Sequence, residues 1–291
     1  MQNELFARIE NITCDLSKGQ VRIAEYIINN SEKAAFMTAH RLGDTVGVSE
    51  STVVRFADRL GYEGYPEFQH ALQDEIKTKL TSVQRIELAN NAIGNSDILE
   101  KIMNSDAEKI RSTLDNIDRT AFHKAVESIL SAEMVYILGV RSSSALSGFL
   151  GFYLRHILEN VKLIINASGS EMFEQIMRIN EKDAVIGISF PRYSSRTVKA
   201  IKYARDKGAS VVAITDSEAS PIAQNADYAL YARSDMLSFV DSLTAPLSLI
   251  NALIVALALK RRESVYSTFE ELEHIWDEYG VYEKHKGEAN E

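Results

Sequence analysis

From residue 120 onward the chain alternates short apolar runs with segments of helical periodicity, and this alternation restricts the possible folds more than any other feature. The apolar, β-rich runs are Met134–Leu138, Val161–Ile165, Ala184–Ser189, Ser210–Thr215 and Tyr228–Tyr231. Continuous apolar strands separated by helices are typical of a parallel sheet that is covered on both faces. We therefore predict a doubly wound α/β domain with a five-stranded parallel sheet, whose ligands bind beyond the carboxyl ends of the strands.

The helices of this domain are predicted from the spacing of apolar residues, at Ala145–Glu159, Glu171–Asn180, Thr197–Lys207, Ser220–Asn225, Leu243–Leu259 and Tyr266–Tyr279. The helix at 243–259 is apolar, but at ~1.5 Å per residue it is about 25 Å long and falls short of the ~30 Å bilayer core. Pro246, Ser248 and Asn251 also interrupt it. We expect a core or dimer-interface helix here and no membrane span, and an amphipathic helix packed on the domain at 266–279.

The first 80 residues have few strand signals and are predicted to form short helices. Ser17 is a suitable N-cap for a helix over Lys18–Asn30, and further helical segments follow at Ala34–Met37, Thr38–Thr45 and Ser49–Leu60, with Gly61 after the last one. Residues 81–119 are polar and helix-prone. The predicted organisation is an all-α bundle at 1–80, a helical linker at 81–119 and the α/β domain at 120–291.

Residues 38–60 have the spacing of a helix-turn-helix, in which the second helix enters the major groove of DNA. Leu42 lies on the first helix, Gly47 in the turn, and Ser49 caps the second helix, whose inward face carries apolar side chains. Hydroxyls and arginines on the outer face can contact phosphates and base edges. The predicted DNA-binding residues are Arg41, Ser49, Ser51, Thr52, Arg55 and Arg59. The alternative is a small helical bundle with a capped helix and no DNA contact.

The net charge of the chain is unfavourable for DNA binding. It is −9 with a sequence pI near 5.3, and residues 1–80 carry 9 Lys and Arg against 12 Asp and Glu. Neutralisation of phosphates by Lys and Arg supplies essentially all non-specific affinity for DNA. A scaffold that binds neither DNA nor a small ligand would explain the acidic balance, so DNA binding has to be inferred from the motif.

The stretch from SKGQVRIAEYIINN through TAHRLGDTVGVSESTVVRFADRLGYEGYPEFQHAL resembles the N-terminal domain of the RpiR family of bacterial transcription regulators. The segment VSESTVVRFADRLGYEGYPEF is similar to that family's recognition helix and the aromatic exit that follows it. The resemblance implies a helix-turn-helix regulator whose partner is a double-stranded DNA operator. Because such proteins usually read two half-sites about 34 Å apart, we expect a homodimer or homotetramer.

Hydroxyl-rich loops follow three of the predicted strands, at Gly139–Ser144, Ser189–Thr197 and Thr215–Ser217. The first two run into helices, where free N–H groups and the positive end of the helix dipole suit a phosphate. A serine at a strand-to-helix turn is also a common N-cap without any ligand. Both readings of a single loop stay open, but two such loops on neighbouring strands favour a ligand site.

Residues Ala121–Arg262 resemble a SIS (sugar isomerase) domain, which follows the DNA-binding domain in the RpiR family. The likeness is carried by ILGVRSSSALSGFL, ISFPRYSSRTVKAIKYARDKGASVVAITDS and SPIAQNADYAL. It implies that the two serine loops bind the phosphate of a phosphosugar, and hence a small anionic effector. The predicted effector-binding residues are Ser142, Ser143, Ser144, Ser189, Arg192, Ser194 and Ser195.

The second loop departs from the family's pattern, which is Ser-x-Ser-Gly-x-Thr, often with a glutamate two residues on. Pro191 and Arg192 stand at the Ser-Gly positions, and Arg196 stands at the glutamate position. The missing carboxylate weakens a general-base role for this loop. Two arginines favour a more anionic ligand, with a carboxylate or a second phosphate, because Arg binds such groups through two hydrogen bonds. Alternatively, both arginines pair with surface acids on neighbouring helices.

Nothing else in the sequence predicts a cofactor, a metal ion or catalytic residues. The six histidines have no HExxH-like spacing, and no P-loop or GxSxG motif is present. The single Cys14 fits a reducing cytoplasm, and the N-terminus lacks an apolar run of signal-peptide length. We predict a cytoplasmic, ligand-responsive transcription regulator. The alternative is a phosphosugar isomerase with a helical N-terminal appendage.

Overall fold

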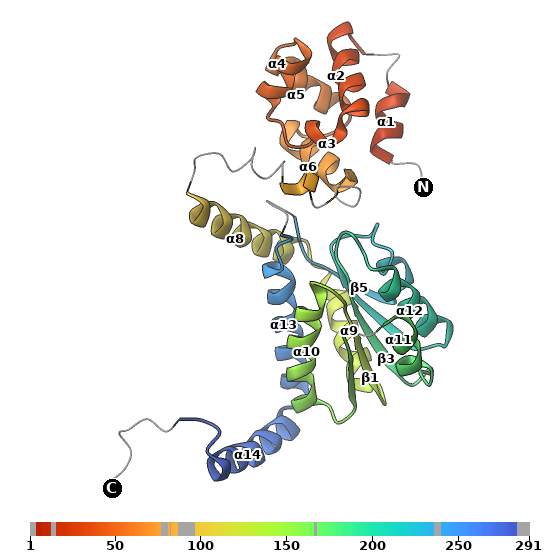
Figure 1. Ribbon diagram of the computed structural model, residues 1–291, viewed down its shortest axis with the longest axis vertical. Coiled ribbons are helices and arrows are strands. Elements are labelled where there is room, and N and C mark those ends of the chain that lie inside the picture. Colours follow the sequence, from red (N-terminus) through yellow and green to blue (C-terminus); the bar gives the residue numbers. More distant parts are fainter. Residues whose placement is uncertain are drawn as a thin grey trace. The chain divides into compact units, whose positions relative to one another are not determined.

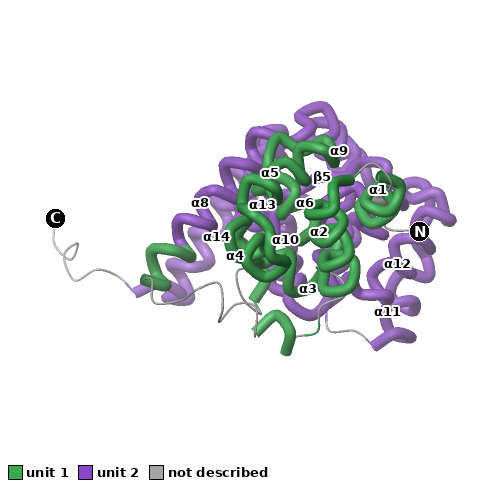
Figure 2. The backbone as a smooth tube through the Cα atoms, turned by 90° about the horizontal axis from the view of Figure 1, so that it is seen from above, with its two compact units in different colours: residues 1–102, 236–241 green, residues 103–235, 242–291 purple. Residues whose placement is uncertain are grey.

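The computed structural model describes residues 4–12, 16–76, 81, 83–86, 97–165, 168–235 and 240–283, so Cys14 lies outside the described residues. Two compact units are distinguished in the chain (Figure 2). Unit 1 comprises Met1–Ile102 and Met236–Asp241, and unit 2 comprises Met103–Asp235 and Ser242–Glu291.

The described part of unit 1 is a bundle of short helices (Figure 1), namely α1 (Glu4–Ile12), α2 (Lys18–Asn29), α3 (Ser31–Ala34), α4 (Ala39–Val46), α5 (Glu50–Arg59) and α6 (Tyr65–Ile76). Ser17 forms a capping box with Gln20 at the start of α2, which confirms the predicted N-cap. Gly61 follows α5 in the left-handed conformation, with φ +87°, as expected for the residue after a helix. Phe56 of α5 packs edge to face on Phe68 of α6 at the centre of the core, with ring centroids 5.8 Å apart.

Unit 2 contains the five predicted strands in one parallel sheet of order β2-β1-β3-β4-β5. The strands are β1 (Val135–Leu138), β2 (Val161–Ile164), β3 (Ala184–Ile188), β4 (Ser210–Thr215) and β5 (Tyr228–Tyr231). This confirms the predicted doubly wound sheet, with strand ends that differ from the prediction by at most one residue. Because β1 lies between β2 and β3, the strand order reverses next to β1, and ligands of such sheets bind at this kind of reversal.

Helices cover both faces of the sheet (Figure 1), with α9 (Arg119–Ser131), α10 (Ser143–Ile157) and α13 (Thr244–Lys260) on one face and α11 (Gly169–Ile176) and α12 (Ser195–Asp206) on the other. Successive residues of β1 alternate between the two cores, with Val135 and Ile137 in the first and Tyr136 and Leu138 in the second. Every residue of β1 is buried, which explains why the strand is apolar without alternation. The helix α8 (Ile98–Asn116) precedes α9, in the region predicted as a helical linker.

One expectation for unit 2 is wrong in part, and the predicted C-terminal helix is confirmed. The helix predicted at Ser220–Asn225 is only a single 3-10 turn, η2 (Ala223–Asn225). The C-terminal helix α14 (Arg262–Tyr279) forms, but none of its residues is buried. Its contact with the domain includes Phe269, which stacks on His156 of α10 at 5.5 Å.

Within the described ranges, no single helix is long and apolar enough to cross a bilayer. The pair α13 and α14 would pass by length and composition together, but the two helices are bent by 98° relative to each other.

Candidate functional site

The turn between α4 and α5 is fixed by residues that few other side chains could replace. The Thr38 hydroxyl accepts a hydrogen bond from the backbone N–H of Arg41 (3.2 Å) and caps α4, and Gly47 ends this helix with φ +70°. A side chain at Gly43 would place its Cβ 2.8 Å from the carbonyl oxygen of Val48. This close approach of α4 to the turn thus requires glycine. The first turn of α5 is exposed.

The exposed first turn of α5 carries a cluster of hydroxyls. Ser49 Oγ lies 2.9 Å from Ser51 Oγ and 2.8 Å from Thr52 Oγ1, and Arg55 Nη2 donates to Ser51 Oγ at 3.4 Å. Ser49 stands at the N-cap position, but its side chain makes no capping bond to the helix backbone. The predicted cap is therefore wrong in its chemistry: the hydroxyl bonds to its neighbours on the surface instead. These neutral donors and one guanidinium face outward beside the positive end of the helix dipole.

The second candidate site lies at the carboxyl edge of the sheet, where loops follow the adjacent strands β1 and β3. Gly139 follows β1, and a Cβ at this position would collide with Ser147 Oγ of α10 and would lie 2.9 Å from the carbonyl oxygen of Ser143. Only glycine lets the loop pass this close to α10. Arg141 then adopts φ +57°, in the left-handed region, and the chain enters α10 at Ser143.

The three serines of the first loop have different surroundings. Ser142 is exposed at the N-cap position of α10 and makes no capping bond, whereas Ser143 is only 5% exposed. Ser144 Oγ donates to the carbonyl oxygen of Arg141 at 2.6 Å, which stabilises the loop. Ser142 thus leaves the start of α10 without a side-chain cap, while the backbone N–H groups of Ser144 and Ala145 donate to the carbonyl oxygens of Arg141 and Ser142 at 3.0 and 3.3 Å.

The second loop is anchored to the end of β4. Tyr193 donates a hydrogen bond to Asp216 Oδ1 at 2.8 Å, and burial together with the charge of Asp216 raises the pKa of this tyrosine far above its ordinary value. Thr215 Oγ1 lies 2.7 Å from the carbonyl oxygen of Ser189 and 2.7 Å from Ser220 Oγ. The hydroxyls of Thr215 and Ser220 are thus used inside the protein, and that of Thr215 contacts the start of the second loop.

The predicted residues of the second loop occupy the start of α12. Ser194 caps this helix by accepting from the N–H of Thr197 at 3.5 Å, so the N-cap reading applies to it. Ser189 is 3% exposed, while Ser195 and Arg192 are exposed, the latter with φ +66°. Hydroxyls, helix N–H groups and arginines consequently lie on two loops that flank the reversal of strand order.

Two family models match this chain. One is described as the helix-turn-helix domain of the rpiR family and matches residues 3–79, and the other is described as the SIS domain and matches residues 128–256. The chain belongs to the RpiR family. The resemblance drawn from each half of the sequence is thereby confirmed.

Several relatives and solved structures are similar to this RpiR-family protein. An uncharacterized HTH-type transcriptional regulator of Haemophilus influenzae is 28% identical over 77% of each chain, and one of Caldanaerobacter subterraneus is 23% identical over 94% of this chain and 96% of the relative. The sugar isomerase domain of an RpiR transcription factor from Sphaerobacter thermophilus is 26% identical, with a TM-score of 0.59 over 62% of this chain and 99% of its own. The NanR protein of Vibrio vulnificus, solved with ManNAc-6P, has a TM-score of 0.58 at 22% identity, covering 95% and 99% of the two chains. The curated relatives bear the names of transcriptional regulators, which favours the regulator over the isomerase alternative.

In this RpiR-family regulator, the predicted DNA-binding residues Ser49, Ser51, Thr52 and Arg55 lie together on the first turns of α5. Arg41, Arg55 and Arg59 are all exposed. Sequence reasoning missed Arg22 of α2, whose Nη2 donates to the carbonyl oxygen of Gly47 at 3.0 Å and thus sits beside the turn. Only the fold brings Arg22 there. Acidic groups are also present, since His40 lies 3.3 Å from Asp44 and 3.7 Å from Glu50.

Two buried hydroxyls at the second site were also missed. Ser147 of α10 and Thr197 of α12 are both 0% exposed, and neither Ser147 Oγ nor Thr197 Oγ1 has a hydrogen-bond partner among the described residues. Buried polar groups are almost always paired, so each such exception calls for an explanation. Ser147 Oγ points at Gly139, at the start of the first loop. No sequence signal marks these two residues, because their burial depends on the packing of α10 and α12.

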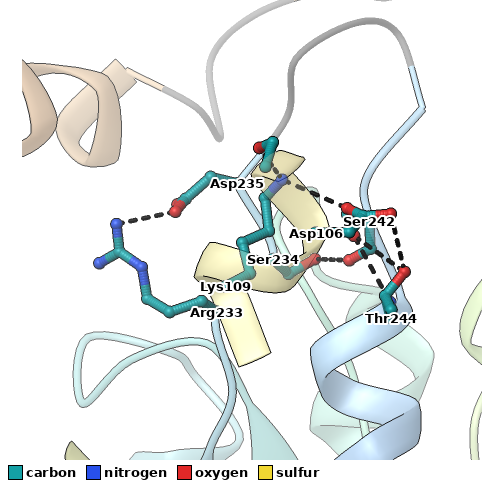
Figure 3. A network of polar contacts seen from close by, with 8 residues as sticks. Asp106, Lys109, Arg233, Ser234, Asp235, Ser242 and Thr244 are labelled. Carbon is teal, nitrogen blue, oxygen red and sulfur yellow. Dashed lines mark hydrogen bonds and ion pairs between the residues drawn. The ribbon is translucent and has the colours of Figure 1, made fainter. Parts of the chain in front are cut away.

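A polar network joins α8 to the start of α13 (Figure 3). Asp106 accepts hydrogen bonds from Ser242 Oγ at 2.6 Å and Thr244 Oγ1 at 3.0 Å, and Lys109 Nζ lies 3.5 Å from the same carboxylate. Burial by itself raises the pKa of Asp106, but the hydrogen bonds and the charge of Lys109 outweigh it and hold this pKa below its ordinary value. Ser234 Oγ donates to the carbonyl oxygen of Ser242 at 2.9 Å, which ties the segment after β5 to the same network.

Among the described residues, no group of three or more His, Cys, Asp or Glu side chains could hold a metal ion.

Proposed function

We propose that this regulator binds operator DNA through the exposed face of α5 and that a sugar phosphate bound at the β1 and β3 loops controls its affinity for the operator. The observation that carries the effector site is the pair of buried hydroxyls without partners, on the two helices that start at these loops. A phosphate is the ligand that hydroxyls and helix N–H groups suit best. The NanR protein was solved with ManNAc-6P, which is a sugar phosphate, and we infer the same class of ligand for this chain.

The regulator is proposed to act in the cytoplasm as a homodimer or homotetramer. Helix-turn-helix proteins usually read two half-sites, so two recognition helices must be held at a fixed spacing. Helix α13 is apolar on its exposed side as well, where Val255 is 49% and Leu259 69% exposed. A helix that is apolar all round is usually buried, and a second copy of the chain would bury this side. Effector binding then changes operator affinity by favouring one arrangement of the two copies, and DNA must affect effector binding by the same factor.

The DNA-binding role is tested with Arg55→Ala. DNA sites are first selected from a random-sequence library with the unaltered protein, and affinities are then measured by fluorescence anisotropy. We expect a loss of about 1–3 kcal/mol for selected sites, because a guanidinium that reads a base is removed. Arg178→Ala, which removes an exposed arginine from unit 2, should bind as the unaltered protein does. Equal affinities of Arg55→Ala and the unaltered protein would remove Arg55 from the interface.

The effector role is tested with Ser143→Glu and Ser142→Glu. Each places a carboxylate where the phosphate is proposed to bind, and the exposed position 142 accepts the larger side chain without repacking. Sugar phosphates should no longer raise the melting temperature of either variant, whereas binding to selected DNA should persist. A full thermal response in both variants would mean that the phosphate binds elsewhere.

A further inference from the structure

Arg141 adopts a backbone conformation that arginine disfavours. Its φ is +57°, in the left-handed region, which glycine enters readily and in which a residue with a Cβ loses free energy. Residues held in such conformations are concentrated at functional sites. Arg192, with φ +66°, is the other non-glycine case among the described residues, but it already has interaction partners within the chain. The side chain of Arg141 forms no hydrogen bond or ion pair within the described ranges.

The backbone on both sides of Arg141 is held in place by α10. The carbonyl oxygen of Arg141 accepts hydrogen bonds from the backbone N–H of Ser144 at 3.0 Å and from Ser144 Oγ at 2.6 Å. On the other side, Gly139 lies so close to α10 that a Cβ there would collide with Ser147 Oγ. The turn therefore keeps its conformation although arginine disfavours it, and its guanidinium group is carried by an ordered backbone.

The charge of Arg141 is also placed unfavourably for the empty protein. The residue is exposed and lies two positions before the first residue of α10, where the helix dipole is positive. Cations are stabilised at the opposite, carboxyl end of a helix and are disfavoured here. The loop at 139–144 contains no Asp or Glu that could compensate the charge. Both the backbone conformation and the charge of Arg141 thus reduce stability, and an anion bound at the loop would offset the second effect.

A buried hydroxyl independently indicates a ligand at the same loop. Ser147 is completely buried, its Oγ has no partner among the described residues, and this atom lies against Gly139. Buried hydroxyls are almost always hydrogen-bonded, so an unpaired one calls for a partner. The loop therefore has an unused hydroxyl on its inner side and an unpaired guanidinium in its exposed part.

We propose that Arg141 is a phosphate-binding residue of the effector site and that the chain loses stability at this position in exchange for affinity. This inference rests on the phosphate site of the proposed function. A guanidinium group binds phosphate oxygens through charge-assisted hydrogen bonds, two of which can form in parallel. The bound phosphate supplies the negative charge that the loop and the amino end of α10 lack.

The test compares ligand affinity with the stability of the empty protein. Inorganic phosphate, glucose 6-phosphate, ribose 5-phosphate and N-acetylmannosamine 6-phosphate are titrated into the full-length protein in a calorimeter, and the tightest binder is used for the variants. Arg141→Gly should bind it at least about tenfold more weakly, corresponding to ~1.4 kcal/mol. Without ligand, the same variant should melt about 2–4 °C higher, because glycine fits the left-handed backbone.

Two further variants isolate the role of the guanidinium group. Arg141→Asn removes the charge but keeps a side chain that tolerates the left-handed conformation, so it should lose affinity as Arg141→Gly does. Arg178→Gly is the matched control, because it removes an exposed arginine that precedes β3 and therefore lies at the opposite, amino edge of the sheet. The backbone of Arg178 does not have positive φ, so this variant should keep its affinity and gain no stability.

Each contrary result identifies what fails. Equal affinities of Arg141→Gly and the unaltered protein would overturn the role of Arg141 and leave the phosphate site intact. Weaker binding together with a lower melting temperature would also overturn it, since arginine would then stabilise the loop. Unchanged binding by Arg141→Asn would assign the loss in Arg141→Gly to a looser backbone. Failure of all four ligands to bind the unaltered protein would overturn the phosphate site and the role of Arg141 together.

Discussion

Gly139 shows how one residue determines the shape of the proposed effector site. It lies between a buried strand and the first turn of α10, where a Cβ would meet Ser147 Oγ and the backbone of Ser143. The loop can pass over the helix start only because this position has no side chain. Gly148, nine residues further along, is a glycine without such a constraint, since a Cβ there would have no neighbour within 4 Å.

Gly139→Ala should lower the free energy of unfolding by about 1–3 kcal/mol, because a methyl group is forced into occupied space. It should also weaken binding of sugar phosphates, because the loop has to move. Gly148→Ala lies within α10 and should instead raise the free energy of unfolding by up to about 1 kcal/mol, since alanine favours a helix. Urea denaturation of both variants checks the opposite signs. If both substitutions stabilised the protein, a methyl group at position 139 would fit beside Ser147, and the role assigned to Gly139 would be contradicted.

At the residue scale, the sequence predicts contacts that are local and misses contacts that depend on packing. The Ser17 capping box and the left-handed Gly61 follow from spacing within a few residues, and both are confirmed. The bonding of Ser49 was predicted wrongly, because its hydroxyl had two competing partners in Ser51 and Thr52. The unpaired hydroxyl of Thr197 could not be predicted, since burial of a threonine in a helix start is decided by residues far away in the sequence.

At the scale of elements, the network around Asp106 connects parts of unit 2 that are distant in sequence. Its carboxylate from α8 accepts from Ser242 and Thr244 at the start of α13, and Thr113 of α8 accepts a hydrogen bond from the N–H of Arg233 after β5 at 3.0 Å (Figure 3 shows the residues around Asp106). The segment after β5 leaves the sheet at its carboxyl edge, as do the proposed effector loops. The network thus fixes α8 to the edge of the sheet that is proposed to bind the effector.

Asp106→Asn should lower the free energy of unfolding by about 1–3 kcal/mol near neutral pH, since a carboxylate loses charged hydrogen bonds. The pKa of Asp106 is lower in the folded protein than in the unfolded chain, so this stabilisation is present above the unfolded pKa and is lost as the pH falls through the folded pKa. The unaltered protein should therefore lose more stability than Asp106→Asn on acidification.

Denaturant unfolding at a series of pH values below neutrality measures this difference. Asp115→Asn, which alters an exposed acid on the same helix, should follow the unaltered protein. Parallel pH curves for Asp106→Asn and the unaltered protein would contradict the role assigned to Asp106.

Elements were predicted well where the signal extends over the whole element. The strands of four to six residues stand out as apolar runs, and their ends were predicted within one residue. The segment at Ser220–Asn225 was predicted too long, because apolar spacing over six residues cannot distinguish a helix from one 3-10 turn. The helix predicted to pack on the domain at 266–279 does so as part of α14, where Phe269 stacks on His156 of α10, although none of its residues is buried.

At the scale of the whole molecule, an acidic chain is proposed to bind a polyanion. The net charge of −9 repels DNA at long range, so binding has to depend on a few arginines that contact phosphates directly. Arg41, Arg55 and Arg59 are exposed around α5, and Arg22 lies beside the turn. We therefore expect affinity for specific DNA sites with little affinity for unrelated DNA.

The salt dependence of DNA binding tests this expectation. With three or four arginines from each of two copies, the plot of log K against log salt should have a slope between about −5 and −7. Arg41→Gln should make this slope shallower by about 2 in a dimer, because one phosphate contact is lost from each copy. Affinities at several salt concentrations supply the measurement, and a slope steeper than about −10 would require cationic contacts outside the surface described.

The left-handed conformation of Arg141 and Arg192 also has a consequence for evolution. Every glycine codon becomes an arginine codon when its first base changes to cytosine. At both positions the backbone accepts glycine without strain, so the protein tolerates the exchange in either direction. A single point mutation at either position therefore exchanges a positive charge for an uncharged glycine at the edge of the proposed effector site, while the backbone that carries the loop stays the same.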